Sequence, residues 1–319
     1  MKLISVILLS HNQKQYLKNC IDSVLKQSYK KTEIIAIDNN SADGSAEFIK
    51  KEYPEIKLVR NIRNEGYARA HNKGIDISNG EYVLPLNIDL VFNENYIEEM
   101  IRVIARDGRA GMAQGKLYQM PQGNEHGRID SLGVYIKKNR QNLDIGYGEE
   151  DAGGYNKSTY VFGASGAAPL YKRKMLEDIK IDKEYFDEDF FMYREEVDLA
   201  WRAQLAGWKC LYVPAAVAYH SRAYSPDTRK NMPERLRYLQ YRNRYLMLIK
   251  NELPLTFIVH FFNILLFEIA AFFYMVFREP FLLKAWPDII RLMPKMLEKR
   301  REIMRKKKVS TRYILSMIK

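Results

Sequence analysis

The sequence predicts an α/β protein in which a mostly parallel sheet is flanked by helices, followed by a helical extension at the C-terminus. Two patterns predict the first part: short apolar runs alternate with stretches of helical periodicity up to residue 89, and polar residues follow several of the runs. The third observation is a change after residue 225, where the chain becomes basic and strongly apolar. We therefore expect one domain over residues 1–225 and a membrane-associated helical region over residues 226–319.

The expected elements alternate in order along the first part of the chain. Strands are predicted at residues 2–10, 33–38, 57–61 and 81–89, and helices at residues 15–27, 45–53 and 67–77. Because this order produces parallel strands, ligands are expected outside the carboxyl ends of the strands. The two cysteines, Cys20 and Cys210, lack metal-ligand spacing, so we expect core residues and a reducing compartment.

The net charge of +12 is distributed unevenly. Of the 51 Lys and Arg and the 39 Asp and Glu, residues 226–319 hold 20 and 8, which leaves 31 of each in residues 1–225. A basic cluster can bind nucleic acid nonspecifically. Since this one accompanies an apolar run of 25 residues, an anionic membrane surface is the simpler partner, and no specific nucleic acid is expected.

Polar side chains follow three of the predicted strands. The first strand ends on Ser10, His11 and Asn12, the second on Asp38, Asn39 and Asn40, and the last on Asn87 and Asp89. Each alone could form a turn or cap a helix. Because the carboxyl ends of parallel strands meet at one edge, the joint occurrence predicts a polar crevice for one ligand.

Three segments together resemble glycosyltransferase family 2, and the rhamnosyltransferase-like branch looks most similar. They read "SVILLSHNQKQYLKNCIDSVLKQSYKKTEIIAIDNNSADGS", "NIRNEGYARAHNKGIDISNGEYVLPLNID" and "FDEDFFMYREEVDLAWRAQLAGWKCLYVPAAVAYHS". The resemblance covers roughly residues 3–225. It implies a GT-A fold, a UDP- or dTDP-activated sugar donor, a divalent metal, and inversion at the anomeric carbon during the synthesis of cell-surface polysaccharides.

The resemblance implies donor contacts at the first two strand ends and at the start of the third helix. Ser10, Asn12 and Asp38 would hold the nucleoside, through groups that bind base or ribose. In "RNEGYARAHNKG", glycine lets the backbone approach the donor, and the helix N-terminus favours phosphate. The residues implied there are Asn64, Gly66, His71 and Asn72. A lone histidine on a helix is otherwise a surface residue or one whose hydrogen bonds are satisfied.

Asn87 and Asp89 match the metal motif of the family, with Ile88 where proline is frequent. At a spacing of two along a strand both side chains face the same way, so two oxygens can converge on one Mg²⁺ or Mn²⁺. Asn87 is also counted among the donor contacts. His220, in "AYHS", matches a histidine that lies near the metal and the diphosphate in related enzymes.

The catalytic base is expected in "YREEVDLAWR", which offers Glu195, Glu196 and Asp198. Acids in a first helical turn can simply complement the helix dipole. The family has Glu-Asp where this chain has Glu-Glu, so Glu196 falls at the position of the base. A positioned base typically supplies about 10²–10⁴ in rate.

Further segments resemble the acceptor side of the family. These are "IDSLG" and "FGASGAAPLYKR", and residues 121–158, rich in Gly, Asn and Asp, are expected to form a loop. Two other functions stay open. A sugar nucleotidyltransferase would need a glycine-rich loop after the first strand, where "SHNQKQY" has no glycine, and a catalytically degenerate relative would only bind glycan or lipid.

The C-terminal region is expected to lie on a membrane. Residues 234–250 predict a basic, aromatic amphipathic helix, and residues 253–277 form an apolar run. On one continuous helix Thr256, His260, Asn263 and Tyr274 would share a face, with Glu268 off it. Both flanks are positive, which favours an interfacial or re-entrant segment on the cytoplasmic face over a single span, and suits a glycan or lipid-linked acceptor.

Overall fold

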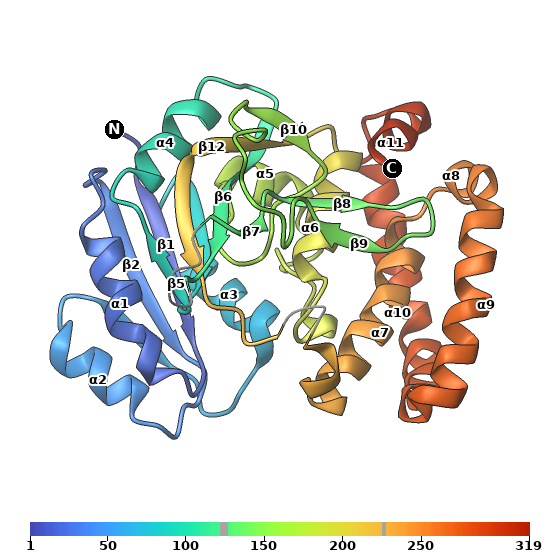
Figure 1. Ribbon diagram of the computed structural model, residues 1–319, viewed down its shortest axis with the longest axis horizontal. Coiled ribbons are helices and arrows are strands. Elements are labelled where there is room, and N and C mark those ends of the chain that lie inside the picture. The colour runs from blue at the N-terminus through green and yellow to red at the C-terminus, as the bar shows by residue number, and fades with distance from the viewer. Residues whose placement is uncertain (122–126, 225–227) are drawn as a thin grey trace.

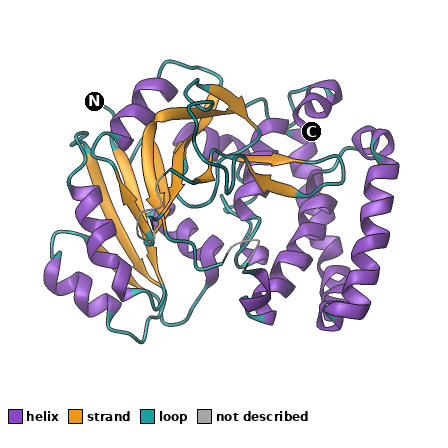
Figure 2. Ribbon diagram, in the orientation of Figure 1, coloured by secondary structure: helices purple, strands orange, loops and turns teal. Residues whose placement is uncertain are grey.

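The protein is a mixed α/β structure, which confirms the predicted fold class (Figure 2). The computed structural model describes residues 1–121, 127–224 and 228–319. One sheet has the strand order β10-β12-β6-β11-β4-β1-β2-β3, and a two-stranded hairpin lies beside it. The predicted domain boundary between residues 225 and 226 lies outside the described residues.

The four predicted strands form the parallel half of the sheet. They are β1 (Ile4–Ser10), β2 (Thr32–Asp38), β3 (Lys57–Arg60) and β4 (Tyr82–Asn87). β1 pairs in parallel with both β2 and β4, with Ser10 opposite Asp38 and Leu9 opposite Asn87. The polar ends of three strands therefore meet at one edge of the sheet, as predicted.

The helices that join these strands also lie where the periodicity predicts them. They are α1 (Lys14–Leu25), α2 (Ser45–Glu52) and α3 (Gly66–Asp76). Their apolar faces pack on the sheet, and α1 buries Leu17, Ile21 and Val24. This burial anchors the loops at the carboxyl edge, where the candidate site residues lie.

The second half of the sheet was not assigned from the sequence. It consists of β6 (Ala110–Gln119), β10 (Thr159–Val161), β11 (Leu170–Lys172) and β12 (Lys209–His220). β11 is antiparallel to its neighbours, whereas β12 runs parallel to β6. Short β5 (Leu90–Phe92) pairs with the end of β12, with Leu90 opposite His220. That pairing brings His220 beside Asp89.

Three helices cover this half. They are α4 (Tyr96–Ile104), α5 (Arg173–Ile179) and α6 (Glu195–Leu205), the last of which follows a single 3-10 turn at Glu188–Phe190.

The segment predicted as a loop over residues 121–158 contains three short strands, so that prediction was wrong for its described part. Residues 122–126 lie outside the described residues. The strands are β7 (Ile129–Ser131), β8 (Val134–Ile136) and β9 (Asn142–Asp144). Ile129, Val134 and Ile136 are buried, and this apolar alternation is short enough to be hidden among the glycines and polar residues around it.

The C-terminal region is helical. It consists of α7 (Glu234–Asn251), α8 (Pro254–Val259), α9 (Phe261–Arg278), α10 (Ala285–Arg305) and α11 (Thr311–Met317), with 3-10 turns at Arg229–Asn231 and Pro280–Lys284 (Figure 1). The predicted helix over residues 234–250 is present, but Arg242, Arg244 and Lys250 are buried rather than displayed on a membrane-facing side.

Buried ion pairs explain why α7 faces inward. Lys250 Nζ binds Asp187 and lies 2.9 Å from Asp198 Oδ1, while Lys299 Nζ of α10 lies 2.5 Å from Asp187 Oδ1. Arg202 completes the cluster, with Nε 2.9 Å from Asp198 Oδ2. These charges join α7 and α10 to the α/β part, so the division at residue 225 stays a prediction.

The apolar run over residues 253–277 is not one continuous helix, because it breaks at His260 between α8 and α9. Arg140, which is 1% exposed, accounts for the break. Its guanidinium donates to the Thr256 carbonyl at 2.8 Å, lies 3.1 Å from His260 Nδ1, and pairs with Glu252 at 2.6 Å. Thr256 and His260 therefore attach the run to the rest of the protein.

Glu268 is also turned inward, towards α7. Arg244 Nη1 lies 2.6 Å from Glu268 Oε1, and Tyr245 Oη donates to Glu268 Oε2 at 2.6 Å. The opposite side of α9 is apolar and exposed. Of the 24 large apolar side chains that are exposed in the described residues, 18 lie between residues 255 and 297. By length and composition α9 is the one described helix that could cross a membrane.

Candidate active site

The carboxyl ends of β1 and β2 present two buried polar atoms without partners. Ser10 Oγ and Asp38 Oδ1 make no hydrogen bond, although both residues are 1% exposed. The other Asp38 oxygen accepts from Ser41 N at 3.2 Å. Since an unpaired buried donor or acceptor costs about 1–3 kcal/mol, a ligand that completes these bonds would recover that free energy.

Asn12 and Asn64 have structural bonds that sequence reasoning did not foresee. Asn12 adopts a φ of 53°, and its Oδ1 accepts from Ala42 N at 2.7 Å. Asn64 Oδ1 accepts from Gly66 N and from Asn39 Nδ2, each at 2.9 Å. Their oxygens hold the loops that follow β2 and β3 and are already occupied.

Asn39 is the centre of this loop network; it was predicted among the polar strand-end residues but was given no ligand contact. Its Oδ1 accepts from Asn61 Nδ2 at 2.9 Å and from Glu65 N at 3.0 Å, and its Nδ2 also donates to the Gly66 carbonyl at 3.2 Å. The residue is 2% exposed. Its position directly after Asp38 was the available signal, because an amide there can satisfy a neighbouring loop.

Gly66 has a φ of +79°, and a Cβ at this position would lie 2.3 Å from the carbonyl oxygen of Phe191. That oxygen accepts from Ala68 N at 3.2 Å. The close backbone approach that the glycine permits is therefore towards the 191–194 loop. The N-terminus of α3, predicted to favour phosphate, is partly occupied by this contact.

His71 and Asn72 lie in the core, away from the sheet edge. His71 is fully buried beside the ring of Tyr67, with centroids 4.2 Å apart, and burial lowers the pKa of His71 to about 3. The side chain of Asn72 forms two hydrogen bonds to the backbone of Phe186: it donates to the carbonyl at 2.8 Å and accepts from the N–H at 2.9 Å. Packing uses the side chain of Asn72, whereas both ring nitrogens of His71 are buried without a hydrogen-bond partner, so the donor contacts of these two residues stay predictions.

Asp89 and His220 meet at the end of β4. His220 Nε2 lies 3.3 Å from Asp89 Oδ1, and His220 Nδ1 lies 2.8 Å from Asp130 Oδ2. Burial lowers the pKa of His220, but hydrogen bonds to the two carboxylates outweigh it and raise the pKa to about 9. A buried imidazole between two carboxylates is thus held in one orientation.

The chain of charges continues from Asp130 into the neighbouring cavity. Arg222 Nε lies 2.6 Å from Asp130 Oδ1, and Arg222 Nη2 lies 2.8 Å from Asp144 Oδ2. Ser131 Oγ donates to Asp144 Oδ1 at 2.7 Å. Asp130 and Asp144 were not predicted as site residues, although "IDSLG", which contains Asp130, was placed on the acceptor side.

Glu196 lines a cavity of about 810 Å³ that Arg222 and Asp144 also line. Burial raises its pKa above the ordinary value, and the backbone and Arg194 partly oppose that rise. Glu195 is more deeply placed, with Oε2 unpaired, and burial followed by the charge of Glu196 raises its pKa well above the ordinary value. Of the two glutamates, Glu196 is the one on the cavity.

Asp198 does not reach the cavity, so its prediction as a catalytic residue was wrong. It is fully buried, and Oδ1 accepts from Asn251 Nδ2 at 2.7 Å while Oδ2 pairs with Arg202. Its carboxylate belongs to the buried ion cluster under α7. The first turn of α6 thus carries both a cavity-facing acid, Glu196, and a structural one, Asp198.

Residues 166 and 167 join the two halves of the candidate site. The carbonyl of Ala167 accepts from Asn87 N at 3.0 Å, and a Cβ at Gly166 would lie 3.5 Å from Glu196 Cγ. The end of β4 and the start of α6 are therefore neighbours across two residues of "FGASGAAPLYKR". This segment was expected on the acceptor side, and the structure places it between Asn87 and Glu196.

The loop before Glu195 is strained. Phe191, Tyr193 and Arg194 have φ values of 65°, 71° and 73°, in a region that residues other than glycine rarely adopt. Asn243 of α7 lies beneath it, with Nδ2 2.9 Å from the carbonyl oxygens of Phe190, Met192 and Tyr193. The loop that positions the two glutamates is thus held by the C-terminal region.

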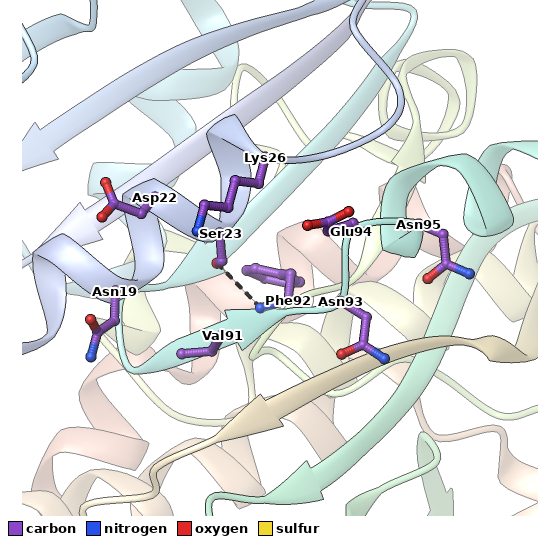
Figure 3. A pocket seen from close by; sticks show the side chains of 9 residues that line it. All are labelled: Asn19, Asp22, Ser23, Lys26, Val91, Phe92, Asn93, Glu94 and Asn95. Atoms are coloured by element: carbon purple, nitrogen blue, oxygen red, sulfur yellow. Dashed lines mark hydrogen bonds between the residues drawn. The ribbon is translucent and has the colours of Figure 1, made fainter.

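A separate hollow lies between α1 and β5, and Figure 3 shows its lining. Its Ser23 Oγ accepts from Phe92 N at 3.2 Å, and Asp22 accepts from Lys18 and Tyr53 at 2.6 and 2.7 Å. These groups are satisfied within the protein. Since the hollow is lined neither by the predicted strand-end residues nor by Glu195 or Glu196, we do not consider it the active site.

The residues at the end of β4 fit a divalent cation. Asp89 Oδ1 is buried with His220 Nε2 3.3 Å away, and the donor set of carboxylate, imidazole and amide oxygen suits Mg²⁺ or Mn²⁺. Within the described ranges no three His, Cys, Asp or Glu side chains are grouped to hold a metal by themselves. Substrate phosphates and water would complete such a site, as is usual for Mg²⁺.

The chain belongs to glycosyl transferase family 2, whose model matches residues 5–180. This membership favours a glycosyltransferase over the sugar nucleotidyltransferase that the strand–helix order also allows.

Two curated relatives illustrate the likeness. Poly-beta-1,6-N-acetyl-D-glucosamine synthase of Staphylococcus aureus (strain COL) is 27% identical over 222 residues, which cover 68% of this chain and 49% of the relative. Glycosyltransferase GlyA of Streptococcus pneumoniae serotype 4 is 29% identical over 196 residues, which cover 59% of this chain and 27% of the relative. The matches thus span half or less of the relatives.

Solved structures share the fold. GalNAc-T7, crystallised with UDP, GalNAc and Mn²⁺, superimposes with a TM-score of 0.66 at 16% identity, covering 100% of this chain and 57% of that one. The mannosyltransferase PcManGT of Pyrobaculum calidifontis, in complex with GDP-Man and Mn²⁺, gives 0.56 at 14% identity, covering 98% and 83%. S. aureus TarS 1-349 gives 0.57 at 16% identity, covering 96% and 90%. These likenesses establish the predicted GT-A fold.

Proposed function

We propose that this protein is a metal-dependent inverting glycosyltransferase. It would transfer a hexose, with rhamnose among the candidates, from a UDP- or dTDP-sugar to a hydroxyl of a glycan acceptor in cell-surface polysaccharide synthesis. The observation that carries the proposal is the junction at residues 166–167, which brings the end of β4 beside Glu196. The two solved structures that contain Mn²⁺, one with UDP and one with GDP-Man, support a nucleotide-sugar donor and a divalent metal, without distinguishing the nucleotide.

In this proposal the nucleoside lies against Ser10 and Asp38, whose unpaired buried atoms can bind its hydroxyl and N–H groups. Asn87, Asp89 and His220 would hold the divalent cation, which when bound offsets negative charge on the departing diphosphate. His220, fixed by Asp130 on its other nitrogen, stays oriented towards that end of the donor.

Glu196 is the proposed base. It accepts the proton of the acceptor hydroxyl while the hydroxyl oxygen forms a bond to the anomeric carbon, and the bond from that carbon to the diphosphate breaks with its electron pair leaving on the diphosphate. Attack from the side opposite the leaving group inverts the anomeric configuration. The raised pKa of Glu196 suits this role, because a base is most effective when its pKa lies near the working pH.

The enzymatic proposal is tested by nucleotide release. Purified protein is incubated with UDP- and dTDP-hexoses, with Mn²⁺ or Mg²⁺ and with EDTA, and free nucleoside diphosphate is measured. We expect slow release from at least one donor that EDTA abolishes and Asp89→Asn strongly reduces. Donor binding without release by the native protein would instead identify a catalytically degenerate relative.

We further propose that the protein lies on the cytoplasmic face of the membrane, held by the exposed apolar sides of α8, α9 and α10 and by flanking basic residues. Because α7 and α10 share buried ion pairs with the α/β part, deleting residues 226–319 would unfold the protein. The sharper test replaces exposed Phe262 and Leu266, which are 75% and 67% exposed, by glutamate. Flotation with anionic liposomes should be lost in this variant, and unchanged flotation would contradict the membrane role.

A further inference from the structure

Three adjoining cavities lead from Glu196 to the outer side of α9. The first, of about 810 Å³, contains Glu196, and the second, of about 490 Å³, lies between α7 and α9. They share Gln141, Arg194, Arg229, Gln240, Arg244 and Phe267. The third, of about 570 Å³, shares Tyr241, Tyr245 and Met275 with the second. The path changes from polar to apolar as it leaves the candidate active site.

Arg194 lines both the first and the second cavity and is the cation at this transition. Its Nε donates to the Gln240 carbonyl at 3.0 Å, whereas its buried Nη1 has no hydrogen-bond partner. Among the described residues no carboxylate forms an ion pair with it. The neighbouring Arg229 and Arg244 differ, because each pairs with a glutamate, Glu279 and Glu268.

The backbone conformation of Arg194 also sets it apart from Arg229 and Arg244. Its φ of 73° is a conformation that glycine or asparagine adopts at lower cost, so an arginine there is explained by its side chain rather than by its backbone. Burial and the nearby charge of Arg244 lower the pKa of Arg194 to about 10. An anion placed between the two guanidinium groups would relieve both the desolvation and the repulsion.

The outer part of the path is suited to hydrocarbon. Aromatic side chains line the third cavity, including Tyr241, Phe257, Phe272 and Trp286. The cavity opens among the exposed apolar residues of α8, α9 and α10, which we assign to the membrane. A ligand that follows the whole path therefore needs a polar end at Glu196, a negative charge at Arg194 and a long apolar chain.

We propose that the acceptor is a lipid-linked glycan in which a phosphate or diphosphate joins the sugar to a long hydrocarbon chain, with the phosphate bound by Arg194 and Arg244 and the chain lying in the groove between α7, α9 and α10. This inference rests on the proposed glycosyl transfer, and it names the acceptor class and the residues that bind it. The phosphate fixes the attached sugar in the cavity of Glu196, so that one of its hydroxyls can reach the base.

The test measures equilibrium binding in neutral detergent micelles without any sugar donor. Geranylgeranyl phosphate carries both recognised features, whereas geranylgeraniol lacks the phosphate and inorganic pyrophosphate lacks the chain. We expect the native protein to bind geranylgeranyl phosphate at least about tenfold more tightly than either fragment, since each fragment loses one set of contacts.

Two pairs of variants locate the ligand. Arg194→Gln should weaken binding of geranylgeranyl phosphate about tenfold, because it removes a charge-assisted contact, whereas exposed Arg291→Gln on α10 should not. Ala271→Trp fills the groove and should weaken binding similarly. Leu266→Trp adds the same ring on the outward side of α9, where the residue is 67% exposed, and should leave binding unchanged.

Equal affinity for geranylgeraniol and geranylgeranyl phosphate would overturn the headgroup site, and competition by pyrophosphate alone at equal strength would point to a free phosphate ligand instead. Equal effects of the two tryptophan variants would overturn the groove. Because no donor is present, these outcomes do not depend on catalysis. Release of nucleoside diphosphate by the native protein, measured separately, decides the underlying transferase proposal.

Discussion

The carboxyl edge of the sheet and the interface beneath α7 both contain buried polar side chains, but they differ in whether those side chains have partners. At the sheet edge Ser10 Oγ and Asp38 Oδ1 are buried without a hydrogen bond. Beneath α7, Asp187 and Asp198 are buried to a similar extent but are paired with lysine and arginine. An unsatisfied polar atom is costly, and Ser10 and Asp38 lie opposite each other at the ends of β1 and β2, so a ligand that bonds both would recover that cost, whereas the paired charges beneath α7 connect parts of the protein.

Disrupting the buried ion pairs beneath α7 should have the largest effect on stability. Lys250→Met removes a fully buried ammonium group and leaves two carboxylates short of a partner, which should lower the free energy of unfolding by about 3–5 kcal/mol. Urea titration followed by circular dichroism measures the change. Lys295→Met is the matched control, because its pair with Asp189 is exposed and should contribute about 0–1 kcal/mol. Equal losses of unfolding free energy in the two variants would contradict a stabilising role of the buried ion pairs.

The second prediction concerns Asn243, through which α7 contacts the loop that precedes Glu195. Asn243→Ala leaves the carbonyl groups of the strained 191–194 loop without their donor and should cost about 1–3 kcal/mol in unfolding free energy. Turnover should fall as well, because the loop positions Glu195 and Glu196. Asn263→Ala changes an exposed residue of α9 and should alter stability by less than about 0.5 kcal/mol. A fully active Asn243→Ala protein would show that α7 does not position the glutamates.

A mutation at the sheet edge should weaken nucleotide binding without lowering stability, in contrast to the variants beneath α7. Asp38→Asn removes a buried charge that has one unpaired oxygen, so the free protein should be as stable as before or more stable. Its affinity for UDP or dTDP should nevertheless fall about tenfold or more, which corresponds to about 1.4 kcal/mol. Calorimetric titration measures the affinity, with exposed Asp76→Asn as control. Lost stability with unchanged nucleotide affinity would place Asp38 among the structural residues.

The sequence predicted the parallel half of the sheet and its strand-end polar residues, because hydrophobic periodicity and strand order are local signals. The resemblance placed Glu196 at the position of the base, but spacing alone does not separate it from Asp198, which stands two residues further along in the first turn of α6. Their roles depend on Lys250 and Asn251, more than 50 positions later in the chain. An even longer separation hid the partners of Arg140, because Glu252 and Thr256 lie 112 and 116 positions later in the chain and nothing near Arg140 indicates that they will surround it.

Three of the predicted donor contacts show a further effect of tertiary packing. His71, Asn72 and Gly66 follow the family pattern, yet their side chains or backbone pack against residues 186–191. Only tertiary packing distinguishes a residue that faces a ligand from one that supports the loop beside it. Asn39, which organises that loop, carries no local signal beyond its place after Asp38.

The smallest predicted effect is a shift in pH dependence. The base must be deprotonated to accept a proton, and burial raises the pKa of Glu196, so turnover should rise with pH through a limb that lies above the ordinary glutamate value of about 4.3. Turnover per donor bound, measured between acid and neutral pH, checks this. The residual turnover of Glu196→Gln should lack the limb, and an unchanged limb in that variant would assign it to another group.

The most direct test of the central claim compares Glu196→Gln with Asp198→Asn in one experiment that records both metal-dependent turnover and urea unfolding. Glu196→Gln should lose about 10²–10⁴ in turnover while its unfolding free energy stays close to that of the native protein. Asp198→Asn should instead unfold at lower urea concentration, because a buried ion cluster loses a charge. A Glu196→Gln protein that turns over at the native rate would contradict the assignment of the base and with it the proposed active site.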